Sequence, residues 1–119
     1  MLADMAIISR YAAFVDIQRE NDYPNGYRAA LLSFSEALDQ SRDINSPFFT
    51  EKAYHIDKAL TYHRLSRLEN EVGNSEKVAE YSALAEGNCA KAGWASCSPE
   101  RLDEVVEKLT KNSLFAAPE

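Results

Sequence analysis

Residues 27–38 read YRAALLSFSEAL, and residues 75–86, 48 positions further on, read SEKVAEYSALAE. In the first stretch, small and apolar residues recur on one face of a helix; they are Ala30, Leu31, Phe34, Ala37 and Leu38. The places equivalent to Ala30, Phe34 and Ala37 in the second stretch hold Val78, Ser82 and Ala85. A recurrence at such a period indicates helix pairs stacked on one another.

The segments that precede these two stretches also match, at an offset of 51 residues. The first carries Tyr11, Phe14, Val15 and Gln18, and the second carries Tyr62, Leu65, Ser66 and Glu69 at the same places. The difference between the two offsets is absorbed by a longer turn in the first pair, residues 20–26 (ENDYPNG). The sequence therefore predicts two helix-turn-helix pairs, at about residues 5–42 and about residues 50–92.

Together the two patterns resemble the tetratricopeptide repeat over roughly residues 11–92. The A-x3-F-x2-A core of that family's second helix matches at Ala30 and Phe34, and the W-x2-L-G-x2-Y pattern of its first helix matches more loosely. The chain departs from the family where Val15 and Ser66 replace the Gly, and no Pro closes either pair. The alternative is a generic antiparallel helical bundle whose halves are alike because both are amphipathic.

The spacing of apolar residues predicts an all-α fold in one domain, residues 1–119, built from five antiparallel helices. They are expected at about 3–18, 27–41, 50–72, 75–92 and 98–111. Thr50 and Ser98 are candidate caps of the third and fifth helices, and Gly73 and Gly93 are expected to end the third and fourth. Asn25-Gly26 is expected to form a turn before the second helix starts. The last helix would cap the second repeat by covering the fourth helix with Leu102, Val105, Val106 and Leu109, with Trp94 at the corner.

Cys89 and Cys97 lie eight residues apart, and their spacing fits no zinc motif. Two readings are open. The residues are free thiols in a reducing cytoplasm, or they form a short disulfide that fastens the fifth helix to the fourth in an oxidising compartment. The expected location is therefore cytoplasmic, or periplasmic or secreted if a leader was removed and the pair is oxidised.

The net charge of −6, with acidic and basic residues interspersed, argues against nucleic acid as a partner. No apolar run approaches the roughly 20 residues that a membrane span needs, so no membrane insertion is expected. Phosphate loops, nucleophile elbows and H-E-x-x-H motifs are absent from the sequence. His55 and His63 are roughly 80° apart around a helix and far apart along it, so no metal site is expected. The sequence predicts a protein that is not an enzyme and carries no cofactor.

The resemblance implies a groove lined by the first helix of each pair, in which a peptide or a partner helix binds. The candidate partner-binding residues of this groove are Asp16, Arg19, His63, Arg67 and Asn70. Arg19, Arg67 and Asn70 are suited to holding a terminal carboxylate. The alternative is that these charges form ordinary exposed pairs along one helix, such as Arg67 with Glu71 or Arg19 with Asp16.

The leading functional hypothesis is a non-catalytic protein–protein interaction module. The alternative is a self-associating structural or regulatory protein, a homodimer whose groove is filled by its own copy, with Phe48 and Phe49 as candidate dimer contacts. A third hypothesis, a small enzyme or ligand carrier, requires a polar cavity that holds His63 and a carboxylate.

Overall fold

The computed structural model describes residues 15–44 and 50–115. Residues 15–21 form the described end of a first helix, and four complete helices follow it. They are α2 (Asn25–Ile44), α3 (Glu51–Glu71), α4 (Ser75–Lys91) and α5 (Pro99–Phe115). Within the described ranges there is no strand, and the prediction of an all-α fold with five helices is confirmed.

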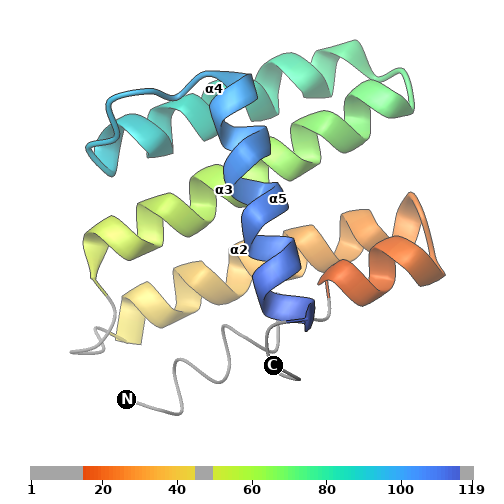
Figure 1. Cartoon of the computed structure of the whole chain (residues 1–119), viewed down its shortest axis with the longest axis horizontal. Coiled ribbons are helices and arrows are strands. Elements are labelled where there is room, and N and C mark those ends of the chain that lie inside the picture. Colours follow the sequence, from red (N-terminus) through yellow and green to blue (C-terminus); the bar gives the residue numbers. More distant parts are fainter. Residues whose placement is uncertain (1–14, 45–49, 116–119) are drawn as a thin grey trace.

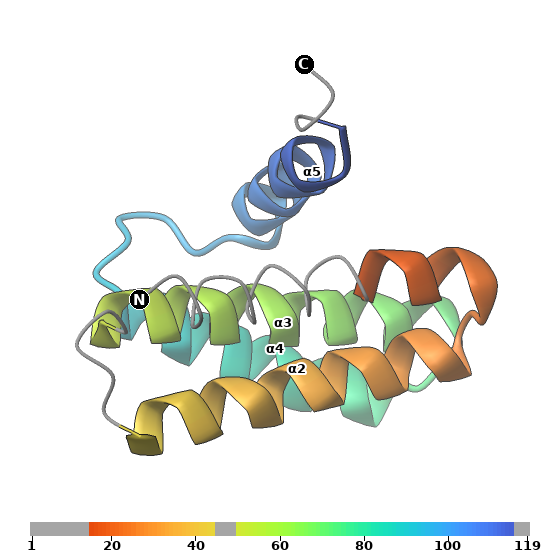
Figure 2. The same cartoon turned by 90° about the horizontal axis from the view of Figure 1, so that it is seen from below.

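Helices α2, α3 and α4 lie side by side, and the chain reverses direction from each to the next (Figure 1). α3 is the middle helix and contacts both neighbours. α5 lies on one side of this group and crosses α3 steeply (Figure 2). The expected antiparallel arrangement therefore describes α2 to α4, whereas α5 runs across them.

Local signals in the sequence fix where the helices start and stop. The Thr50 hydroxyl accepts a hydrogen bond from the Ala53 amide at 3.0 Å, which satisfies one of the unpaired donors at the start of α3. The Ser98 hydroxyl accepts from the Arg101 amide at 3.2 Å at the start of α5. Gly73 has a φ of 82°, the left-handed conformation that lets the chain turn directly from α3 into α4.

The start of α2 differs from the prediction, because Asn25 and Gly26 form the first residues of this helix and not a turn that precedes it. A Cβ atom on residue 26 would lie 2.6 Å from the Cβ of Asp22, so the absence of a side chain at Gly26 lets the helix start close against the preceding turn. The Tyr27 amide then donates to the Asp22 carbonyl at 2.9 Å. Gly26 is therefore needed for close packing. An Asn-Gly pair in a sequence does not show whether its glycine is needed for packing or for a turn.

Two hydrophobic clusters form the core, and α3 belongs to both. The first joins the first helix, α2 and α3 through Val15, Tyr27, Ala30, Leu31, Leu65 and Leu68. The second joins α3, α4 and α5 through Ala59, Leu60, Ala85, Cys89 and Leu102, with Trp94, Val105 and Val106 packed against it. The apolar face of α5 packs on α3, and Leu102 joins the cluster that contains Ala85 and Cys89 of α4. The prediction that this face covers α4 is therefore wrong, because α5 crosses α3 and the described backbones of α4 and α5 do not come close to each other.

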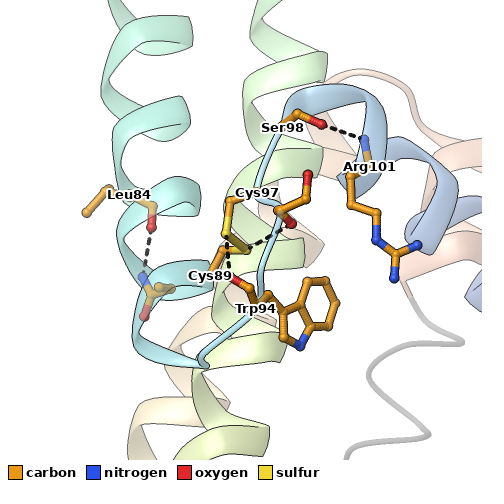
Figure 3. The surroundings of a disulfide bond; sticks show 8 residues. Leu84, Cys89, Trp94, Cys97, Ser98 and Arg101 are labelled. Carbon is orange, nitrogen blue, oxygen red and sulfur yellow. Dashed lines mark hydrogen bonds between the residues drawn. A yellow bond between two sulfur atoms is a disulfide. The ribbon is translucent and has the colours of Figure 1, made fainter.

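Cys89 and Cys97 form a disulfide between the end of α4 and the segment that leads into α5 (Figure 3). Of the two readings that the sequence left open, the structure contains the disulfide. Cys89 is 1% exposed, so the bond anchors the connecting segment to the core immediately before α5 begins.

We predict that reduction of this disulfide lowers the free energy of unfolding by about 2.5 kcal/mol, the loop entropy expected for a short cross-linked loop. Urea unfolding with and without a phosphine reductant measures the difference. A variant with both Cys89 and Cys97 replaced by Ala is the control and should not respond to the reductant. Equal stability of the oxidised and reduced protein would contradict the prediction.

Burial raises the pKa of the Asp57 carboxyl on α3 from 3.8 to about 6, so the stability of the protein should depend on pH. Its ionised form therefore destabilises the folded state, and this penalty develops as the pH rises from 3.8 through 6. Since the side chain keeps some solvent contact, we expect Asp57→Asn to raise the free energy of unfolding by about 1–2 kcal/mol at neutral pH.

Urea unfolding of the Asp57→Asn variant near pH 7 and near pH 4 measures this effect. The gain should shrink toward zero at the lower pH. Glu36→Gln, which neutralises an exposed carboxylate on α2, is the matched control. A gain of equal size at both pH values would show that charge burial is not its cause.

Candidate functional site

A cleft of about 540 Å³ opens where the first helix, the turn before α2, α3 and α5 meet. Its apolar and aromatic lining consists of Tyr23, Tyr27, Leu68 and Val106. Its charged lining includes Arg19, Arg64, Arg67, Glu71 and Asp103, and His63 lies beside them. A concave surface with an apolar floor and a few charged groups is the usual form of a binding site.

One wall of the cleft is a three-residue cluster between α3 and α5. The Asp103 carboxylate lies 2.5 Å from His63 Nε2 and accepts two hydrogen bonds from the Arg67 guanidinium, at 2.7 and 3.1 Å. Burial opposes the charge of Asp103, but the hydrogen bonds from Arg67 and His63 outweigh it and lower the pKa of the carboxyl. Burial lowers the pKa of His63, against the opposing effect of Asp103.

Behind the cleft, Arg64 donates to the Asp16 carboxylate at 2.9 Å, and this pair joins α3 to the first helix. The Asp16 side chain is 6% exposed and that of Arg64 is 14% exposed. A buried pair of this kind contributes little net stability, but either partner left alone would be a costly buried charge.

Arg19 lies at the mouth of the cleft, with its guanidinium 5.6 Å from the centre of the Tyr27 ring. Tyr23 stacks on Tyr27 at 5.9 Å, and its hydroxyl donates to Glu71 on α3. Within residues 15–44 and 50–115, no carboxylate forms an ion pair with Arg19. The described partner of this guanidinium is therefore the Tyr27 ring, at a distance typical of a cation–π contact.

The structure brings together three of the five predicted groove residues, Arg19, His63 and Arg67, in the lining of one cleft. Asp16 is buried behind it in the pair with Arg64. Asn70 is exposed and lines other hollows along α3 and α4.

Asp103 is the described partner of Arg67, and Asn70 lines a second hollow together with Arg67 but does not line the cleft that contains Arg19. The role of Arg19, Arg67 and Asn70 as a carboxylate clamp stays a prediction. The alternative prediction of pairs along one helix is wrong, since Arg67 and Asp16 pair with residues of other helices. Phe48 and Phe49 lie outside the described residues, so their role in a dimer stays a prediction.

Sequence reasoning missed Tyr23, Arg64 and Asp103 as parts of the site. Tyr23 and Asp103 are brought to α3 from 48 and 40 positions away respectively, distances at which periodicity carries no information. Asp103 lies about one helical turn after Pro99, near the start of the helix. An acidic residue there is usually explained by its favourable interaction with the helix dipole, so it does not indicate a binding site. Arg64 could have been found, because it is adjacent to His63 and one turn from Arg67 and Leu68.

No protein-family model, curated protein or solved structure matches the chain. Among the helices of the described ranges, none is long and apolar enough to cross a membrane. The described part of the chain also contains no group of three or more His, Cys, Asp or Glu side chains arranged to hold a metal ion.

We predict that Arg64→Met lowers the free energy of unfolding by about 3–5 kcal/mol, because it leaves the Asp16 carboxylate buried without its partner. Chemical denaturation at neutral pH measures this loss. Adding Asp16→Asn to the same chain should recover most of it, since the buried charge is then gone. Arg67→Met, which breaks a half-exposed pair, is the control and should cost about 1 kcal/mol or less. Equal costs for the two arginine variants would contradict the assignment.

Proposed function

We propose that this chain is a non-catalytic protein-binding module that holds an acidic peptide segment in the cleft between the first helix, α3 and α5. The observation that carries the proposal is Arg19, a cation stacked on Tyr27 at an open cleft and free of ion pairs within the described residues. A guanidinium so placed offers parallel donors to a carboxylate of the ligand.

The rest of the lining favours a peptide over a small rigid ligand. Val106 is partly exposed and offers an apolar surface on the same cleft as the exposed Tyr23 ring, and a single apolar side chain of a peptide would cover it. Glu71 and Glu107 lie on the same cleft, so a uniformly acidic ligand would be repelled. The ligand class that fits is a segment with one or two acidic residues next to an apolar one.

The resemblance of the sequence to tetratricopeptide repeats is consistent with this proposal, because stacked helix pairs commonly bind peptides on one face. The disulfide between Cys89 and Cys97 supports a further part of the proposal, which is that the module works in an oxidising compartment and not in the cytoplasm.

Selection from a display library of random peptides, followed by fluorescence anisotropy on the selected sequences, tests the proposal. We expect the selected peptides to share an acidic residue beside an apolar one. Arg19→Gln should weaken their binding by about tenfold or more, the loss of one charge-assisted hydrogen-bonding group.

Arg101→Gln is the matched control, because Arg101 also lies over an aromatic ring, that of Trp94 at 5.8 Å, but away from the cleft. Replacing the acidic residue of the peptide by Gln should weaken binding to the wild type and have little further effect on the Arg19→Gln variant. Selected peptides that bind the Arg19→Gln variant as tightly as the wild type would overturn the proposal, and so would a library that yields no binder.

A further inference from the structure

The cluster of His63, Arg67 and Asp103 has the geometry of a carboxylate bound by a receptor. Two nitrogens of the Arg67 guanidinium donate to the two oxygens of Asp103, and His63 Nε2 lies 2.5 Å from one of them. Such bidentate, charge-assisted contacts are those by which proteins recognise carboxylate ligands. Here the receptor groups belong to α3, and the carboxylate comes from α5 of the same chain.

The surface around this cluster is hollow on both sides of α5. The 540 Å³ cleft lies on the side of the first helix, and a second hollow of about 160 Å³ lies on the side of α4. His63 and Arg67 line both hollows. α5 contributes Asp103 and Val106 to the first hollow, and Pro99 and Leu102 to the second. α5 therefore separates two hollows along α3, and Figure 1 shows it running across this helix.

Two of the described contacts fasten the start of α5. The disulfide holds Cys97 to α4, and Leu102 is 2% exposed in the core. Beyond Asp103, Glu104 and Glu107 are exposed, and the apolar side chains Val105 and Val106 are only partly buried. The side chains of Asp103 and Arg67 are 48% and 46% exposed, so a carboxylate from solution can reach Arg67 without unfolding the core.

We infer that His63 and Arg67 form a carboxylate-binding site that α5 fills with Asp103 in the free protein, and for which an acidic segment of a partner competes. This inference deepens the proposed function, because it assigns a second acidic position to the same ligand and makes α5 an internal competitor. Arg19 would hold one carboxylate at the cleft mouth, and Arg67 with His63 would hold the other beside α5. If Asp103 is instead only an anchor for α5, the site should not accept another carboxylate.

The first test removes the internal carboxylate and offers acetate in its place. In the Asp103→Ala variant, sodium acetate should shift the NMR resonances of the His63 ring in a saturable manner, whereas sodium chloride at equal ionic strength should not. The double variant Asp103→Ala with Arg67→Gln should lose the response. Glu104→Ala is the matched control, because it removes the neighbouring acid of α5 and leaves Asp103 in place. If the Asp103→Ala variant does not fold, as judged by circular dichroism, Asp103→Asn replaces it as the neutral isostere.

Identical responses to acetate and chloride would overturn the inference, and so would a response that persists without Arg67. Neither outcome depends on a peptide ligand, so the acetate experiment can fail or succeed independently of the proposed function. A library that yields no peptide would contradict the proposed function and would not affect the interpretation of the acetate experiment.

The second test uses the acidic peptides selected on the wild-type protein. Asp103→Asn should tighten their binding by about three- to tenfold, because the peptide no longer displaces a charged competitor. Glu104→Gln removes the same charge from the same helix and should change the affinity much less. Equal effects of the two variants would show that only the overall charge of α5 matters and would refute competition by Asp103.

Discussion

Helix α3 buries charged and polar side chains on several faces, and most of them pair with another helix. Thr61 is an exception, since its hydroxyl donates to the Asp57 carbonyl of the same helix. Arg64 pairs with Asp16 of the first helix, Glu69 with Arg28 of α2, and Lys58 with Asp39 and Ser35 of α2; His55 bonds to Asn88 of α4, Ser66 to Ser82 of α4, and His63 to Asp103 of α5. A buried charge without a partner costs several kcal/mol, on the order of the whole stability of a small domain. The polar residues of α3 therefore specify where the surrounding helices lie, while the apolar clusters supply most of the stabilisation.

The candidate site follows from the same constraint. Around the cleft, Arg64 is satisfied by a buried aspartate, whereas Arg67 is satisfied by a half-exposed one on the crossing helix. Arg19 has an aromatic ring as its partner among the described residues. Arg64 is therefore mostly buried, whereas Arg67 and Arg19 are both exposed.

Much of the secondary structure could be predicted from the sequence. Thr50 and Ser98 cap the helices expected there, and Gly73 ends α3, since these signals act within one turn of the chain. The prediction of a turn at Asn25-Gly26 is wrong, because close packing and turn formation both favour glycine. The direction of α5 could not be predicted, because its apolar stripe fits the steep crossing on α3 as well as an antiparallel position beside α4.

The sequence by itself determined which residues share a face of each helix, and this was sufficient to group His63 with Arg67 and to single out Arg19. Only the tertiary structure decided which carboxylate each cation meets. From the sequence, Arg67 could pair with Glu71 on the same helix, but in the structure it pairs with Asp103 of α5. The physical reason is range. Helix periodicity and capping depend on residues three or four positions apart. The buried ion pairs depend on chain segments that packing brings together from 19 to 48 positions away.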